Sequence, residues 1–277
     1  MSAAFAVTLP HGLIRDGSRR TAALLRPPTG ADEAFLVERR GTTPAELVTE
    51  LLARCVLDLD GETVGRDEVR ALTVGDREAL LLHLRAAAHG ERISCTVDCG
   101  ACGERMDLDV SVADALVPAY ADAPALHETR VGEYTVTFRL PTGADQEAAA
   151  RAADPVAGGR LLVERCVAEV RRRGRPVPGG VPEPVVEALP VAMAELDPQA
   201  ETRVALRCPE CDAPLEALLD AATVVLAELA GSSERLTLEV HALALHYHWS
   251  EDDILALELP RRRRYLELLA ESEGTLA

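Results

Sequence analysis

The sequence contains no lysine, so all 29 of its basic residues other than histidine are arginines. Its 46 acidic residues outnumber them and give a net charge of −17. A protein that wraps DNA needs a surplus of cationic side chains to neutralise phosphates. We therefore expect no nucleic acid partner, and the negative charge favours a basic protein partner.

Long apolar segments and aromatic residues are also scarce. No apolar run approaches the roughly 20 residues of a membrane helix, and the first residues, MSAAFAVTLPHGLIRDG, lack the basic start of a signal peptide. Aromatic residues make up 3% of the chain, but apolar residues reach 48% through Ala, Leu and Val, enough for a packed core. We expect a soluble, cytoplasmic protein without a membrane span.

Sequence patterns of common enzyme sites are missing as well. The chain has no HExxH, no Gly-x-x-x-x-Gly-Lys and no Gly-x-Ser-x-Gly. His241, His246 and His248 are spaced five and two residues apart, so one helix face cannot present all three. We expect packing or capping roles for these histidines and no enzymatic activity.

The chain does contain an internal repeat. Three segments occur twice, in the same order. LRPPTGADEA (25–34) matches FRLPTGADQE (138–147) at an offset of 113 residues, and LLARCV (51–56) matches LLVERCV (161–167) at an offset of 111. ISCTVDCGACGERMDLD (93–109) matches VALRCPECDAPLEALL (204–219) at an offset of 109. Offsets that shrink only slightly indicate a tandem duplication with small deletions.

Each half is predicted to form one α+β unit. A strand ends at Pro-Thr-Gly, Asp32 or Asp145 is the candidate N-cap of the next helix, and a second helix contains Cys55 or Cys166. A further helix and a hairpin with Cys-x-x-Cys at its tip complete the unit. The predicted organisation is repeat 1 over residues 1–128, repeat 2 over 129–230 and a C-terminal helical segment over 231–277.

The two Cys-x-x-Cys pairs predict one shared structural zinc site. Four thiolates suit Zn²⁺ and leave no open position for water, so the predicted ligands are Cys99, Cys102, Cys208 and Cys211. Gly103 and Asp212 follow the pairs, and both residue types tolerate the left-handed backbone of such turns. The alternative is two hairpins without metal, whose thiols only pack together.

Three further cysteines lie outside these pairs. Cys95 could serve as an alternative ligand, but the alternation of its neighbours places it on a strand and favours a buried thiol. Cys55 and Cys166 occupy equivalent positions on apolar helix faces, and we expect both in the core.

Residues 231–277 have no counterpart in the duplication and are predicted to form two or three short helices. Ser250 and Asp253 occupy the positions of a capping box, and Pro260 suits the first position of a helix. The run Arg261–Arg264 lies at a helix start, where the helix dipole disfavours cations. Such a run is either a solvated face or a docking point on this acidic chain.

Several stretches resemble the baseplate-hub assembly proteins of T-even phages, which have relatives in contractile tails and contractile injection systems. They are LTVGDREALLLHLRAAAHGERISC before the first Cys-x-x-Cys, GERMDLDVSV after it, and LHYHWSEDDILALELPRRRRYLELLA near the end. The resemblance is clearest over 45–110 and 235–275. It implies a non-enzymatic protein that builds or joins a tail baseplate, with other baseplate or tail proteins as partners. It also implies partner contacts by Trp249, Leu257, Arg263 and Tyr265.

Two other classes remain open at this point. A zinc-ribbon adaptor for nucleic acid or the transcription machinery requires a basic face, and the arginines near the Cys-x-x-Cys pairs are Arg92, Arg105, Arg203 and Arg207. A zinc hydrolase requires a ligand other than thiolate and an open coordination position.

Overall fold

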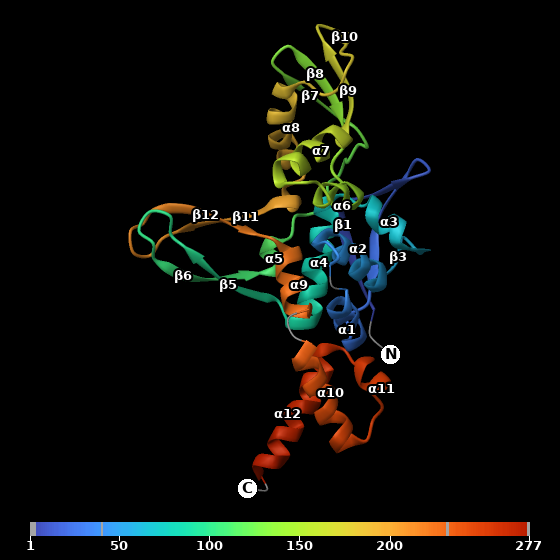
Figure 1. Ribbon diagram of the computed structural model, residues 1–277, viewed down its shortest axis with the longest axis vertical. Coiled ribbons are helices and arrows are strands. Elements are labelled where there is room, and N and C mark those ends of the chain that lie inside the picture. The colour runs from blue at the N-terminus through green and yellow to red at the C-terminus, as the bar shows by residue number, and fades with distance from the viewer. Residues whose placement is uncertain (1–3, 40, 231–232, 276–277) are drawn as a thin grey trace.

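The computed structural model describes residues 4–39, 41–230 and 233–275. The first half of the chain occupies the middle of an elongated molecule, with the sheet of the second half at one end and the C-terminal helices at the other (Figure 1). Two long hairpins project together from the side. Helices and strands are mixed throughout, so the predicted α+β class is confirmed.

The first half begins with a four-stranded antiparallel sheet in the order β1-β2-β3-β4. Its strands are β1 (Phe5–Arg15), β2 (Ser18–Leu25), β3 (Val56–Leu59) and β4 (Glu62–Thr63). The helices of this half are α1 (Gly30–Glu38), α2 (Pro44–Cys55), α3 (Arg66–Ala71), α4 (Val74–His89) and α5 (Val112–Ala115). Helix α4 is central and is buried on nearly every side, with Leu80, Leu81, Leu82 and Leu84 all in the core.

The second half has a sheet of the same design. The strands β7 (His127–Val131), β8 (Tyr134–Phe138), β9 (Val167–Arg172) and β10 (Arg175–Pro176) are paired in chain order. The register shifts between Leu24 and Leu25 where β2 meets β3, and between Thr137 and Phe138 where β8 meets β9. These positions differ by the same 113 residues as the sequence repeat. The helices of this half are α6 (Gly143–Ala150), α7 (Pro155–Cys166) and α8 (Glu183–Leu196), followed by the 3-10 turn η1 (Pro198–Glu201).

The helix after each Pro-Thr-Gly begins differently from our prediction. The N-caps are Thr29 and Thr142, and the aspartates that we predicted as caps lie three residues further on, where their carboxylates accept the backbone N–H of the threonine. Asp32 also binds Arg26 and Arg54, and Asp145 binds Arg139 and Arg165. Both aspartates are buried, so these ion pairs offset the cost of removing their charges from water.

The second helix of each half ends on a buried cysteine, as predicted. Cys55 and Cys166 are 0% and 1% exposed, and burial raises the pKa of each thiol to about 12. Both are therefore core residues. The larger core joins the first half to the later helix α9 (Ala221–Ala230) through Val225 and Leu229, and a smaller core lies under the second sheet.

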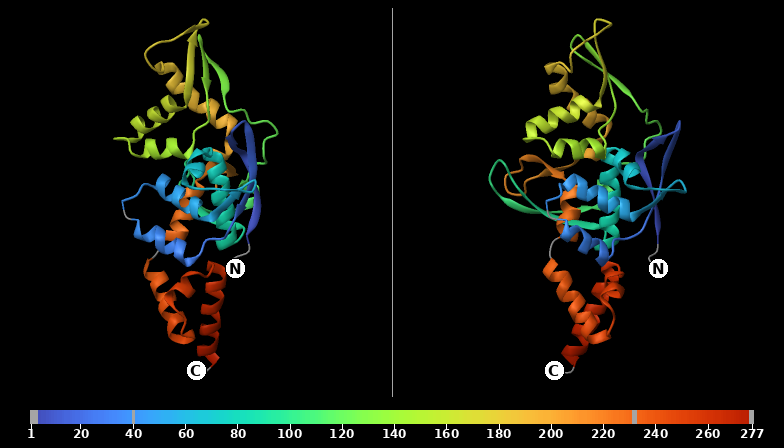
Figure 2. Two further views of the ribbon diagram at one scale, coloured as in Figure 1. Left: turned by 90° about the vertical axis from the view of Figure 1, so that its right-hand side faces the viewer. Right: turned by 45° about the vertical axis from the view of Figure 1, so that its right-hand side comes forward.

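The C-terminal segment forms the helices α10 (Ser233–Tyr247), α11 (Glu251–Leu255) and α12 (Leu259–Thr275), which lie beyond the first half in every view (Figure 2). Ser250 caps α11 as expected, and α12 begins one residue before Pro260. The arginine run is not uniformly solvated, because Arg262 is fully buried between Glu33 and Glu239. Within the described residues, no helix is long and apolar enough to cross a membrane.

Candidate metal centre and the contact between the halves

Two antiparallel hairpins carry the Cys-x-x-Cys pairs at their tips. The first consists of β5 (Arg92–Asp98) and β6 (Arg105–Ser111), and the second of β11 (Thr202–Arg207) and β12 (Pro214–Leu219). Side chains alternate between half-buried and exposed along most of both hairpins, and the sequence predicted this alternation for the first. The two hairpins form one arm, and their tips meet at its end (Figure 1).

The turns at the two tips have the same geometry. The N–H of Cys99 donates to the carbonyl of Glu104 and that of Gly103 to Cys99, while Cys208 donates to Ala213 and Asp212 to Cys208. Gly103 has φ of 77° and Asp212 has φ of 55°. The left-handed backbone expected after each second cysteine is present.

The four thiols converge between the tips. Cys99 Sγ lies 3.8 Å from Cys211 Sγ, Cys102 Sγ lies 3.6 Å from Cys208 Sγ, and all four sulfurs are within 4.8 Å of one another. Four thiolates about 2.3 Å from a zinc ion at the centre of a tetrahedron are about 3.8 Å apart. Disulfide sulfurs would be about 2.0 Å apart. The cluster therefore fits a tetrahedral metal ion, with Zn²⁺ as the ion that such a donor set prefers.

The environment of the thiols repeats between the two tips. The first cysteine of each pair is buried and the second is exposed. Hydrogen bonds from the backbone N–H groups of Cys102 and Ala101 lower the pKa of Cys99 to about 7, whereas contacts with neighbouring thiols raise the pKa of Cys102 to about 12. Cys95 lies on β5 opposite Leu108, is half-buried, and is not a member of the four-thiol group.

The arginines near the thiols are paired with acids and form no free basic face. Arg92 binds Asp109, Arg105 binds Asp98, Arg203 binds Glu201 and Glu216, and Arg207 binds Asp212. Most of these side chains are exposed, so each pair contributes little to stability. Their effect is to neutralise the positive charge that a nucleic acid would require.

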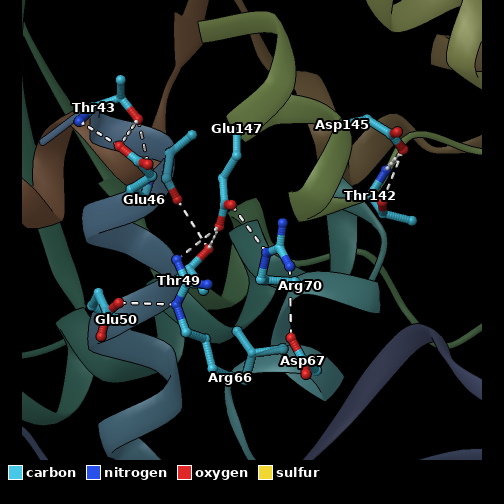
Figure 3. Close-up of polar contacts among 12 residues, drawn as sticks. Thr43, Glu46, Thr49, Glu50, Arg66, Asp67, Arg70, Thr142, Asp145 and Glu147 are labelled. Carbon is cyan, nitrogen blue, oxygen red and sulfur yellow. Dashed lines mark hydrogen bonds and ion pairs between the residues drawn. The ribbon is translucent and has the colours of Figure 1, made fainter. Parts of the chain in front are cut away.

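A second polar cluster joins the two halves (Figure 3). Glu147 on α6 is 1% exposed, accepts a 2.7 Å hydrogen bond from the Thr49 hydroxyl on α2, and binds Arg70 Nε on α3 at 3.0 Å. Arg66 lies 3.9 Å from the same carboxylate. At the edge of the cluster, Arg151 of the second half binds Glu46 of the first.

Two of the predicted partner residues, Trp249 and Tyr265, belong to one aromatic group in the C-terminal segment. The rings of Trp249 and Tyr247 stack at 4.8 Å, and Tyr265 meets Trp249 edge-on at 4.9 Å. Arg263 is exposed on α12, but the Leu257 carbonyl accepts the N–H of Gly30 within the chain. The partner role of these residues stays a prediction.

The sequence comparisons address the family. A model of the family described as T4 bacteriophage base plate protein matches residues 18–178, which is more than half of the chain. The chain belongs to this base plate protein family. No curated protein and no solved structure matches it. The likeness to a baseplate family is confirmed, and the narrower likeness to hub assembly proteins stays a prediction. The terminal motif at 245–270 lies outside the match.

Three buried ionic residues of this base plate family member have no signal in the sequence. Glu147 joins the halves, Arg77 is 1% exposed at the same contact, and Arg262 fixes the C-terminal helices. A charged residue is rarely buried unless it is paired, and the partners of these three lie up to 229 residues away in sequence. No local pattern could have identified them.

Proposed function

We propose that this protein is a non-enzymatic component or assembly factor of the baseplate in a contractile, phage-tail-like injection system. The observation that carries the proposal is the family match over residues 18–178. The four-thiol cluster agrees with it, because a site closed by four thiolates is structural and offers no position for a substrate. Other baseplate or tail proteins are the proposed partners.

In this proposal Cys99, Cys102, Cys208 and Cys211 hold one Zn²⁺ that links the two hairpins. A metal bound by four thiolates stabilises a fold by tying distant segments, and the paired tips connect the two sequence halves. The equal strand order and the equal register shifts support the proposed duplication, with one zinc-binding hairpin from each copy.

The aromatic group of the C-terminal helices is the proposed partner surface. It gathers Tyr247, Trp249 and Tyr265, while aromatic residues make up only 3% of the chain. Trp, Tyr and Arg are the residues that most often dominate protein interfaces. Arg261, whose guanidinium lies 5.9 Å from the centre of the Tyr265 ring, adds a cation beside it.

A tagged full-length chain, expressed with its tail gene cluster, tests the role. We expect the chain either in purified particles at a fixed ratio to the other proteins or bound to baseplate subassemblies, and we expect deletion of its gene to prevent complete particles. Normal yields of working particles without the chain would refute the proposal. In the same cells, Trp249→Ala combined with Tyr265→Ala should reduce incorporation, and Val191→Ala on exposed α8 is the matched control.

A further inference from the structure

A second repeat links the C-terminal segment to the first half. Residues 65–77 and 250–262, which we name the first and second docking segments, correspond at a constant offset of 185 residues. Each starts at the N-cap of a short helix, with an acid three residues later, and continues through a leucine into a long helix that carries a buried arginine. The paired residues are Gly65 and Ser250, Glu68 and Asp253, Leu72 and Leu257, and Arg77 and Arg262.

Each docking segment binds a copy of the same sequence, Pro-Thr-Gly-Ala-Asp. We name residues 28–32 the first PTGAD loop and residues 141–145 the second. The first docking segment binds the second loop: the N–H of Gly143 donates to the Leu72 carbonyl at 3.1 Å, and Thr73 forms an antiparallel bridge with Thr142.

The second docking segment binds the first loop through the equivalent atoms. The N–H of Gly30 donates to the Leu257 carbonyl at 3.1 Å, and Glu258 forms an antiparallel bridge with Thr29. Both bridges are isolated from the sheets, so they do not arise from extension of a strand.

A buried arginine covers the glycine of the loop in both contacts. A methyl group on Gly143 would lie 2.4 Å from Arg77 Nη1, and one on Gly30 would lie 2.7 Å from Arg262 Nη1. Only glycine allows an approach this close without displacing the guanidinium. The two contacts are therefore one recognition mode used twice, between different parts of the chain each time.

Such a contact joins two unlike surfaces, head to tail. A head-to-tail contact can close within one chain, or it can continue from one molecule to the next. The second docking segment lies on α11 and α12, which follow α9 and α10 in the chain. It also carries Arg262, which binds Glu33 beside the first loop.

We propose that two copies of this chain exchange their C-terminal helices, with the second docking segment of one copy bound to the first PTGAD loop of the other. The contacts in the exchanged dimer are the same as those in the closed monomer. The balance between the two forms therefore depends on the effective concentration of the segment attached to the same chain, compared with the concentration of other copies. The partner surface at Trp249 and Tyr265 is a separate feature, and the exchange stands without it.

Two full-length variants test the exchange. Gly30→Leu blocks the first PTGAD loop and keeps the docking segment, whereas Arg262→Glu places a third carboxylate beside Glu33 and Glu239 and keeps the loop. Neither variant alone has both an intact first PTGAD loop and an intact second docking segment, so neither can form this contact within a chain or between two identical copies. We expect both to be monomers in analytical ultracentrifugation and their mixture to form a 1:1 dimer of twice the mass.

The control is the double variant that carries both changes. Mixed with either single variant, it supplies no matched pair of loop and segment, so no dimer should form. If the two single variants are folded by circular dichroism and stay monomeric when mixed, the exchange is refuted.

A second measurement serves if Gly30→Leu or Arg262→Glu fails to fold. A protease site inserted between residues 230 and 233 of the otherwise unaltered full chain is cleaved after folding. A fluorescent peptide of residues 233–277 should then replace the cleaved segment, and a peptide with Arg262→Glu should not. Failure of the unaltered peptide to enter, or equal entry of both peptides, would overturn the proposal.

Discussion

Gly143 lies directly beneath the guanidinium group of Arg77, and a methyl group on its Cα would stand 2.4 Å from Nη1. The guanidinium cannot move aside freely. It is 1% exposed and donates to the carbonyls of Val69 and Ala45 and to the Thr49 hydroxyl. The start of the second half is thus packed against a buried cation of the first.

Replacement of this glycine should destabilise the protein. We expect Gly143→Ala to lower the free energy of unfolding by about 2 kcal/mol, because the displaced arginine would lose buried hydrogen bonds. Gly159 on α7 is the control, since nothing lies within 4 Å of an added methyl group there. Gly159→Ala should raise the free energy of unfolding by about 0.5–1 kcal/mol through helix propensity. Equal effects in urea titrations would contradict the packing argument.

The buried Glu147 should matter more than exposed ion pairs. Glu147→Ala removes an acceptor of the buried Thr49 hydroxyl and one of the two carboxylates that bind Arg70, and loss of such a buried partner costs about 1–3 kcal/mol. The control is Glu164→Ala, which removes the exposed partner of Arg160 and should cost less than about 1 kcal/mol. Denaturant unfolding measures both, and comparable losses would show that the contact between the halves does not depend on this carboxylate.

Zinc binding separates the two classes of cysteine. Elemental analysis of the full chain should find one zinc ion per molecule. Cys102→Ser should weaken the affinity by about 100-fold or more, because each of four ligands carries a share of a binding free energy of about 10–16 kcal/mol. Cys95→Ser should retain the metal, since Cys95 is outside the four-thiol group. Full zinc content in Cys102→Ser would contradict the assignment.

The buried Glu78 predicts a pH-dependent stability. Burial, with a contribution from Asp220, raises the pKa of Glu78 from 4.5 to about 7. Between these values the folded chain holds a proton that the unfolded chain releases. This group's contribution to stability is therefore complete below pH 4.5 and is lost as the pH rises from 4.5 through about 7.

A glutamine at this position cannot ionise but can still accept the N–H of Ala221. Glu78→Gln should therefore raise the free energy of unfolding by up to about 3 kcal/mol at pH 8 and change it little at pH 5. The variant and the parent protein are compared at the same pH, so any effect of pH on the metal site is the same in both. Glu187→Gln on the exposed side of α8 is the control and should show no such trend.

Much of the fold follows from local patterns in the sequence. Alternating residues and Pro-Thr-Gly punctuation predicted the strands, and Cys-x-x-Cys predicted the hairpin tips. Even the error at Asp32 was local, because threonine and aspartate both suit an N-cap and only the backbone geometry distinguishes Thr29 as the cap.

By itself, the sequence determined the repeated motifs and which thiols lie at hairpin tips and which in the core, because turns, caps and strand periodicity depend on neighbours a few residues apart. Only the tertiary structure decided which of four consecutive arginines is buried. Arg262 lies between Glu33 and Glu239, while Arg261, Arg263 and Arg264 remain exposed. The four side chains are chemically identical, so the difference arises only where α12 packs against helices distant in the chain.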